Sequence, residues 1–165
     1  MGSGPIERSA PVEVIDLLIQ QHREVDALFL AFRNASDDTS RRDLCIQLAE
    51  ALMLHSTIEA RWGSPKASRV VGDEKIEHAE QEHQEMTKLL GDIVRMRDDM
   101  NAVKAKVGAL EKVVKRHIAD EEKNILPQVA RNITEKDLGM SCKDLVREAS
   151  RIRREEMRDW GGASL

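Results

Sequence analysis

Two stretches of the chain repeat one pattern of histidine, glutamate and proline, and this repeat limits the folds open to the sequence. Both stretches have the form H-x3-E-x5-P, and they begin at His55 and His117. Upstream of each lies another matching stretch, H-x-E-apolar-x-x-Leu-apolar, which begins at His22 and His83. His22 precedes His55 by 33 residues, and His83 precedes His117 by 34. Because a repeat at a fixed spacing indicates one structural unit used twice, the chain is predicted to contain two copies of one hairpin.

The spacing of apolar residues predicts that this hairpin is helical. Apolar side chains recur at three- and four-residue steps through most of the chain, as in an amphipathic helix. Polar or glycine-containing breaks separate the segments. We expect helices from Pro11 to about Asn34, from about Ser40 to about Trp62, from Asp73 to about Asp98, from about Asn101 to Pro127 or just beyond, and from Thr134 through Gly139 to Met157. The stretch between the second and third helices is predicted to be a short connection.

These helices and short loops predict an all-α fold. The two repeated hairpins would form an antiparallel four-helix bundle, with the last helix as an extra C-terminal element. Thr134 and Asp137 form a capping-box pattern at the start of that last helix. We divide the chain into a flexible N-terminal segment (1–10), the bundle (11–132), and a C-terminal helix with its tail (133–165). Aromatic residues make up only 2% of the sequence, which disfavours an all-β fold.

The charge and composition exclude several classes of function. The chain carries 26 basic and 30 acidic residues, for a net charge of −4, which argues against a nucleic-acid partner bound through a basic surface. No apolar run approaches the roughly 18 residues of a membrane-spanning helix, and the N-terminus shows no signal-peptide pattern. Cys45 and Cys142 lie 97 residues apart and are interpreted as reduced thiols. We therefore expect a cytoplasmic protein with no nucleic-acid or membrane partner.

The repeated histidines and glutamates indicate a metal site inside the bundle. Residues four apart on a helix lie one turn apart and differ in direction by about 40°, so a histidine and the glutamate four residues later aim at a common point. The first-helix histidines lie on the apolar stripes of their helices. The side chains predicted to face the bundle axis are His22, His55, Glu59, His83, His117 and Glu121.

A structural reading of these residues competes with the metal site. One histidine on an apolar face is more often a core residue that is satisfied by hydrogen bonds, and one His-x3-Glu pair is usually a surface contact. Here four histidines and two glutamates fall on inward stripes with a repeated spacing, and buried glutamate is rare unless it is paired or metal-bound. Imidazole suits iron, zinc and copper, and carboxylates bridge two ions. The combination favours a dinuclear site of the kind that helical bundles build from facing helices.

The sequence leaves open the roles of several other polar residues near these positions. His78 lies five residues before His83, about 140° around the helix, and is predicted to be on the surface. Asp26 either holds the imidazole of His22 by a hydrogen bond or faces solvent. Glu122 is a substitute ligand if the helix is locally overwound. The Arg- and Glu-rich last helix is predicted to present a solvated face, with docking of an unknown protein partner as the alternative.

These residues and their spacing resemble the hemerythrin family in its broader form, the HHE cation-binding domain. The matching positions extend over about 17–130 and are His22, His55 with Glu59 and Pro65, Glu82 with His83, and His117 with Glu121, Glu122 and Pro127. The resemblance implies a four-helix bundle around a bridged pair of non-haem iron ions. The ligands it implies are His22 and His55 for one iron, His83 and His117 for the other, and Glu59 and Glu121 as bridges. It further implies an open position for dioxygen, peroxide or nitric oxide.

The chain departs from the oxygen-carrying members of that family at several positions. Ala79 stands where those proteins have a fifth histidine. Ala60 replaces an acidic residue of the family pattern, and Gly63-Ser64 replaces aromatic residues before Pro65. Fewer imidazoles leave more exchangeable positions, which favours redox chemistry or sensing over reversible oxygen carriage.

The predicted function is therefore that of a di-iron protein that senses, detoxifies or binds dioxygen, peroxide or nitric oxide. The main alternative is an iron- or redox-responsive module that binds a partner without catalysis. Two others are a peroxide-consuming enzyme and a purely structural bundle, whose melting temperature would not respond to chelation.

Overall fold

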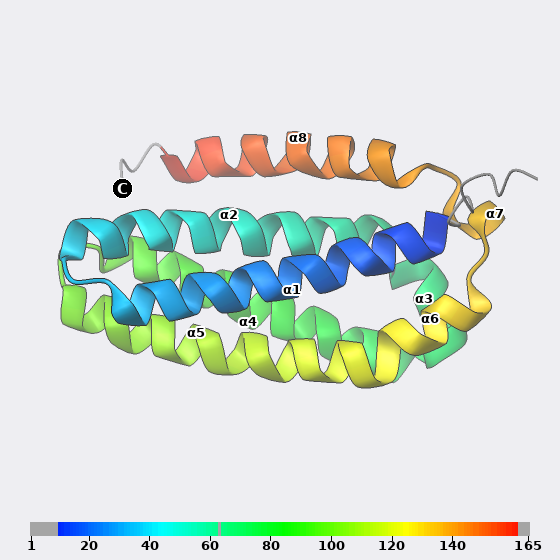
Figure 1. The fold of residues 1–165 in the computed structure, drawn as a ribbon, viewed down its shortest axis with the longest axis horizontal. Coiled ribbons are helices and arrows are strands. Elements are labelled where there is room, and N and C mark those ends of the chain that lie inside the picture. The colour runs from blue at the N-terminus through cyan, green and yellow to red at the C-terminus, as the bar shows by residue number, and fades with distance from the viewer. Residues whose placement is uncertain (1–9, 63, 162–165) are drawn as a thin grey trace, which may run out of the picture.

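The computed structural model describes residues 10–62 and 64–161, and every regular element in these residues is a helix (Figure 1). The all-α prediction is therefore confirmed for the described chain. The predicted flexible segment 1–10 lies outside the described residues except for Ala10, which begins the first helix, and Gly63 and 162–165 lie outside them too. No helix in the described ranges is both long enough and apolar enough to cross a lipid bilayer.

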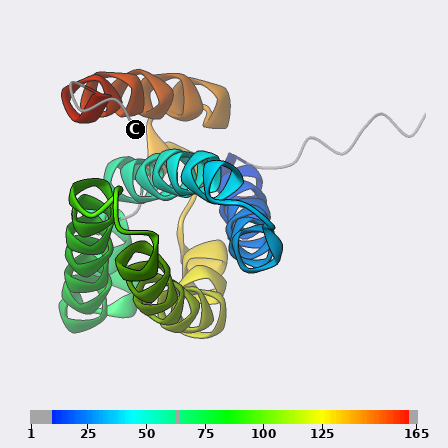
Figure 2. The ribbon, with the colours of Figure 1, turned by 90° about the vertical axis from the view of Figure 1, so that its left-hand side faces the viewer.

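Four long helices make up most of the structure. They are α1 (Ala10–Asn34), α2 (Asp38–Trp62), α4 (Asp73–Arg95) and α5 (Met100–Asp120). α1 packs mainly against α2, and α4 mainly against α5, so each predicted hairpin is a packed pair. The end-on view shows the two pairs set around a common interior (Figure 2). The remaining elements are α3 (Ser64–Val71), the π-helical turn η1 (Glu121–Ile125), α6 (Leu126–Asn132), α7 (Glu135–Leu138) and α8 (Cys142–Gly161).

The apolar interior is divided into two clusters along the length of the bundle. One cluster surrounds Phe29 and Leu110 near the α1–α2 and α4–α5 turns. The other surrounds Leu18, Ile58 and Val129 towards the opposite end. Burying a side chain of this size stabilises the fold by about 1.5–3 kcal/mol, so both clusters hold the long helices firmly. On each long helix the histidine or glutamate of the repeat falls between the two clusters, which places a polar layer across the middle of the bundle.

The stretch predicted to be a short connection is instead the helix α3. Its Ala67 and Val71 are buried in the second apolar cluster, together with Leu126 and Val129 of α6. α3 follows the glutamate of the first repeat and α6 follows that of the second, and the two short helices pack against each other. The duplicated unit therefore extends beyond the hairpin.

The predicted last helix is broken in two. Thr134 and Asp137 form the expected capping box at the start of α7. The continuous helix through Gly139 was wrong, because Gly139 adopts a left-handed conformation with φ of 69° and ends α7. The hydroxyl of Ser141 then accepts a hydrogen bond from the amide of Asp144 at 3.1 Å and caps the start of α8. α8 lies along α2, with its buried residue Leu145 in the second apolar cluster (Figure 1).

Alanine substitutions at two glycines are expected to change stability in opposite directions. Gly139→Ala should lower the free energy of unfolding by about 1–2 kcal/mol, because a side chain is strained at positive φ even where space is open. Gly108→Ala should raise it by about 0.5–1 kcal/mol, because this glycine lies inside α5 with open space around its Cα. Denaturant titration of both variants, followed by circular dichroism, measures the difference. If both variants were stabilised, or both destabilised, the left-handed conformation of Gly139 or the helical conformation of Gly108 would be contradicted.

Candidate metal centre

The polar layer brings together the six side chains singled out by the repeat. Five of them are buried: His22, His55, Glu59, His117 and Glu121. His83 is the exception, since its side chain is 17% exposed whereas those of the other histidines are 2–5% exposed. The layer draws one histidine from each long helix and one glutamate from each second helix or its π-helical extension.

The four imidazoles are arranged as two neighbouring pairs. The ring centres of His22 and His55 are 4.8 Å apart, and those of His83 and His117 are 4.5 Å apart. Between the pairs, the rings of His55 and His117 are separated by 6.1 Å. Each pair therefore comes from one hairpin, as the duplication of the sequence requires.

Each buried carboxylate faces both histidine pairs. The Oε2 atom of Glu121 lies 3.1 Å from Nε2 of His22 and 3.3 Å from Nε2 of His117. The Oε2 atom of Glu59 lies 2.7 Å from Nε2 of His83, while its Oε1 atom lies 3.5 Å from Nε2 of His55. Two carboxylates that each reach both pairs have the geometry needed to bridge two cations.

Two further observations indicate that these histidines and glutamates could hold a metal ion. One ligand atom each from His55, Glu59, His117 and Glu121 lies within 4.8 Å of the others. Nε2 of His55 is buried and has no hydrogen-bond partner among the described residues, although Nδ1 of the same ring donates to Gln21. A buried polar atom without a hydrogen-bond partner destabilises the folded state. A cation bound to Nε2 of His55 would remove this cost.

A comparison with protein families agrees with this geometry. The family model for the hemerythrin HHE cation-binding domain matches residues 13–129, which include all six side chains of the layer. The chain belongs to the hemerythrin family. Comparisons with curated proteins and with solved structures found no match.

In this hemerythrin domain, a second set of residues holds the imidazoles from behind. Nδ1 of His55 donates to Oε1 of Gln21 at 3.0 Å, and Nδ1 of His117 faces Oε2 of Glu82 at 3.1 Å. Gln21 and Glu82 are both buried. Sequence reasoning quoted Glu82 only as part of the family motif, without a role, and did not single out Gln21. The repeat contained the signal, since each immediately precedes the first-helix histidine of its own copy.

Glu122 contacts an imidazole in the same way. Its Oε1 atom lies 2.9 Å from Nδ1 of His22, while Glu121 faces Nε2 of the same ring. Two carboxylates therefore orient one imidazole from opposite sides. Glu122 is in turn bound by Arg23 at 2.6 Å, just as Glu82 is bound by Arg116 at 2.6 Å.

The reason that neighbouring glutamates reach one ring is the π-helical turn η1. In a regular α-helix adjacent side chains point about 100° apart. The fourth helix was expected to continue regularly to Pro127, but η1 inserts a wider turn that begins at Glu121. The helix is thus underwound here, the opposite of the overwinding considered from the sequence. Single π-helical turns of this kind occur frequently at functional sites.

The remaining residues left open by the sequence lie outside the layer. His78 is exposed, as predicted, and its Nε2 atom lies 3.5 Å from the carboxylate of Glu82. Asp26 is paired with Arg23 at 3.7 Å, and no hydrogen bond joins it to an imidazole in the part of the chain that the structure describes. Neither residue contacts the facing nitrogens of the histidine pairs.

A small cavity adjoins the layer on the side of His83. Its volume is about 40 Å³, and its polar lining includes Glu59, His83 and Glu121. Ala79 contributes to its apolar wall, so the position that carries a fifth histidine in oxygen-carrying relatives here faces open space. Because a water needs about 10–15 Å³, the cavity has room for one or two small molecules.

In the metal-free protein, the cluster shifts the pKa values of its members in opposite directions. Burial alone would lower the pKa of His117, but hydrogen bonds with carboxylates, above all Glu121, hold it well above its ordinary value of 6.5. Burial would likewise lower the pKa of His22, but hydrogen bonds with Glu121 and Glu122 raise it. Burial alone would raise the pKa of Glu121, but its side-chain interactions with Glu59 and hydrogen bonds from the imidazoles of His117, His22 and His55 hold it well below 4.5. Contact with the carboxylate of Glu121 therefore favours the protonated form of His22 and His117, and these imidazoles favour the ionised form of Glu121.

The stability of the metal-free protein is expected to decrease as the pH rises above about 6.5. A histidine with a raised pKa stabilises the fold fully below its unfolded pKa of 6.5, and this contribution is lost as the pH rises through the folded-state pKa. Glu121 contributes above its unfolded pKa of 4.5, and its contribution is lost as the pH falls through the depressed value. Thermal melting of metal-free protein across this range measures the effect. A melting temperature that climbs steadily above pH 6.5 would contradict it.

Proposed function

We propose that this chain is an antiparallel four-helix hemerythrin-type bundle that binds two non-haem iron ions and interacts with dioxygen, peroxide or nitric oxide. The observation that carries the proposal is that Glu59 and Glu121 each face both histidine pairs. A single-metal site has no need of two such carboxylates. The free thiols of Cys45 and Cys142 are compatible with the reducing cytoplasm as its location.

The proposed ligands follow from the pairs and from the family. His22 and His55 would hold one iron, and His83 and His117 the other. Glu59 and Glu121 would bridge them. Bound iron would supply the redox chemistry and the affinity for the small ligand.

The protein's own contribution is orientation and exclusion of water. Gln21, Glu82 and Glu122 engage Nδ1 of three histidines, which leaves Nε2 of each ring directed to the centre of the layer. Partners of this kind typically contribute 10–100-fold to metal affinity. The two apolar clusters on either side keep bulk water away, and the adjoining cavity leaves space for a small ligand beside Glu59, His83 and Glu121.

Anaerobic loading of the full chain with Fe²⁺ tests the proposal. We expect about two irons per chain by metal analysis, and a new near-ultraviolet absorption band when the loaded protein meets air. Parallel samples given peroxide or nitric oxide identify which small ligand changes the spectrum, and the rate of peroxide loss shows whether there is turnover. Fewer than one iron per chain, or a spectrum that none of the three ligands changes, would contradict the proposal.

A further inference from the structure

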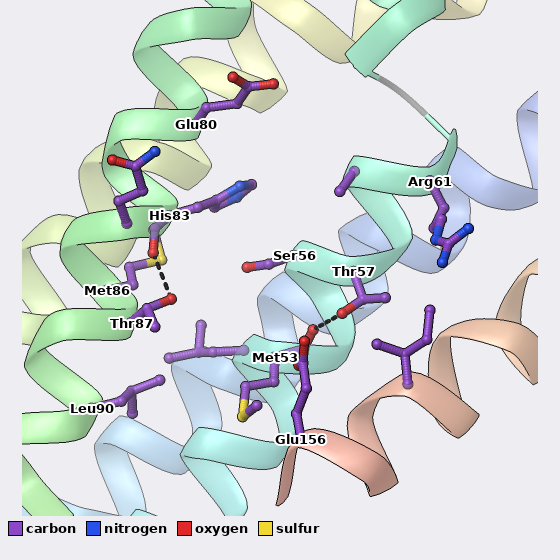
Figure 3. Close-up of a pocket in the computed structure, with 14 residues that line it drawn as sticks. Met53, Ser56, Thr57, Arg61, Glu80, His83, Met86, Thr87, Leu90 and Glu156 are labelled. Atoms are coloured by element: carbon purple, nitrogen blue, oxygen red, sulfur yellow. Dashed lines mark hydrogen bonds between the residues drawn. The ribbon is translucent and has the colours of Figure 1, made fainter. Parts of the chain in front are cut away.

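A large groove runs along the outside of the bundle between α2, α4 and α8. Its volume is about 670 Å³. Met53 and Ser56 line it from α2, Met86 and Thr87 from α4, and Ile152 from α8 (Figure 3). The floor is largely apolar, whereas the rim carries polar side chains. We call this feature the α2–α4–α8 groove.

The α2–α4–α8 groove and the small cavity beside the polar layer have a wall in common. His83 and Glu80 line both of them, although the cavity lies inside the bundle and the groove outside it. In Figure 3 the ring of His83 projects from α4 across the groove towards α2. The imidazole of His83 therefore separates the outside of the protein from the interior of the proposed metal centre.

His83 is also the least constrained of the four histidines. Its side chain is 17% exposed, compared with 2% for His22 and for His117. Each of the other three rings has a hydrogen-bond partner at Nδ1. The polar contacts of the His83 side chain in the described chain are through Nε2, to Glu59 at 2.7 Å and to His117 at 3.1 Å. Nothing in the described residues holds its ring from behind, so it can leave at a lower cost than the others.

The charges on the rim indicate which ligands the groove admits. Glu80 and Glu156 are exposed acids on its lining. The basic residue among its lining side chains, Arg61, is paired with Glu148 at 3.0 Å. The uncompensated charge of the rim is therefore negative, which repels anions and leaves neutral molecules free to approach.

We propose that the α2–α4–α8 groove is the binding site and access route for small uncharged ligands of the metal centre, and that His83 is the ligand they can replace. The exchange involves no redox step: a lone pair on the incoming nitrogen or oxygen takes the place of the lone pair on Nε2 of His83. This inference rests on the proposed function. The groove is large enough for a molecule the size of imidazole, which the inner cavity alone is not.

Chemical rescue by imidazole distinguishes His83 from a fully buried histidine. His83→Gly and the matched variant His22→Gly are titrated with Co²⁺, with bound metal measured by equilibrium dialysis. We expect both variants to bind fewer than the two Co²⁺ ions of the unaltered chain. Millimolar imidazole should restore the lost ion in His83→Gly, whereas His22→Gly should need at least tenfold more. Both variants place a glycine inside a long helix, and circular dichroism checks that both are folded before the titrations are compared.

Several outcomes would overturn the proposal. Equal rescue of both variants, or rescue of neither, would show that the groove gives no special access. Two Co²⁺ ions bound by His83→Gly without imidazole would show that His83 is not a ligand. If the unaltered chain binds no Co²⁺ and no iron, it is the proposed function that fails, and the two failures are thereby distinguished.

A second measurement does not depend on a histidine variant that folds. Ala60 is exposed and lines the groove, and Ala105 is an exposed alanine on α5 away from it. In iron-loaded protein, Ala60→Trp should slow the association of nitric oxide at least fivefold, because the indole occupies the groove. Ala105→Trp should leave the rate within twofold of the unaltered chain. Equal rates in the two variants would contradict the groove as the access route.

Discussion

Replacement of Glu121 by glutamine should abolish tight binding of the iron pair, with a loss of affinity of more than 100-fold. Glu121 is 4% exposed and its Oε2 atom lies within 3.6 Å of Nε2 of His22, His55 and His117. Residues that only support a metal ligand typically contribute 10–100-fold, so removal of the charge at the centre of the layer should cost more. Equilibrium dialysis with Fe²⁺ should give fewer than one ion per chain instead of two.

Glutamine preserves the size of the side chain, so the variant should fold. Without the carboxylate, the pKa values of His22 and His117 should decrease, because Glu121 is the main carboxylate that raises them, while Glu122 and Glu82 still face the two rings. Glu24→Gln is the matched control, because it removes the same charge from an exposed residue near the layer that accepts a hydrogen bond from Gln20. Two irons retained by Glu121→Gln, or lost equally by Glu24→Gln, would show that the buried carboxylate is not a bridge.

The long helices and the inward direction of the six side chains could be predicted because both depend on local periodicity. An apolar stripe at three- and four-residue steps determines which face of α1 or α5 is buried, whatever the partner helix is. The duplicated spacing then brings His22 and His83 to equivalent places. These inferences need no knowledge of how the helices are packed.

Features that depend on packing between distant segments could not be predicted in this way. α3 is helical because Ala67 and Val71 meet residues of α6, more than 50 positions later in the chain. The turn η1 is a departure from α-helical geometry that carries no apolar period. A glycine such as Gly139 can continue a helix or end it in a left-handed conformation. The packing of α8 against α2 selects the left-handed conformation, and local sequence does not show this packing.

The supporting residues of the site show the same limit. Gln21 and Glu82 interrupt the apolar pattern of their helices, but a single helix does not reveal which imidazole each faces. Each contacts the second histidine of its own hairpin, 34 and 35 positions away. Their equivalent places in the repeat suggest that such positions should be compared between copies whenever a duplicated motif carries the ligands.

Metal loading should raise the melting temperature of the protein by about 10–20 °C. A ligand at 100 times its Kd stabilises the folded state by about 2.7 kcal/mol, so two such ions contribute about 5 kcal/mol. For a chain of this length, each kcal/mol corresponds to about 2–4 °C. Differential scanning calorimetry with a small excess of Fe²⁺ under anaerobic conditions, before and after addition of a chelator, measures the shift.

The Glu121→Gln variant separates binding at the layer from binding elsewhere. It should show little or no shift on metal addition, because the proposed bridge is absent, whereas Glu24→Gln should respond as the unaltered chain does. Acid should reduce the shift in the unaltered chain, since the raised pKa values of His22 and His117 mean that protons compete with the metal for the same nitrogens. A melting temperature that does not respond to metal or chelator at neutral pH would instead identify the layer as a structural network, in which the carboxylates and Gln21 hold the imidazoles without a cation.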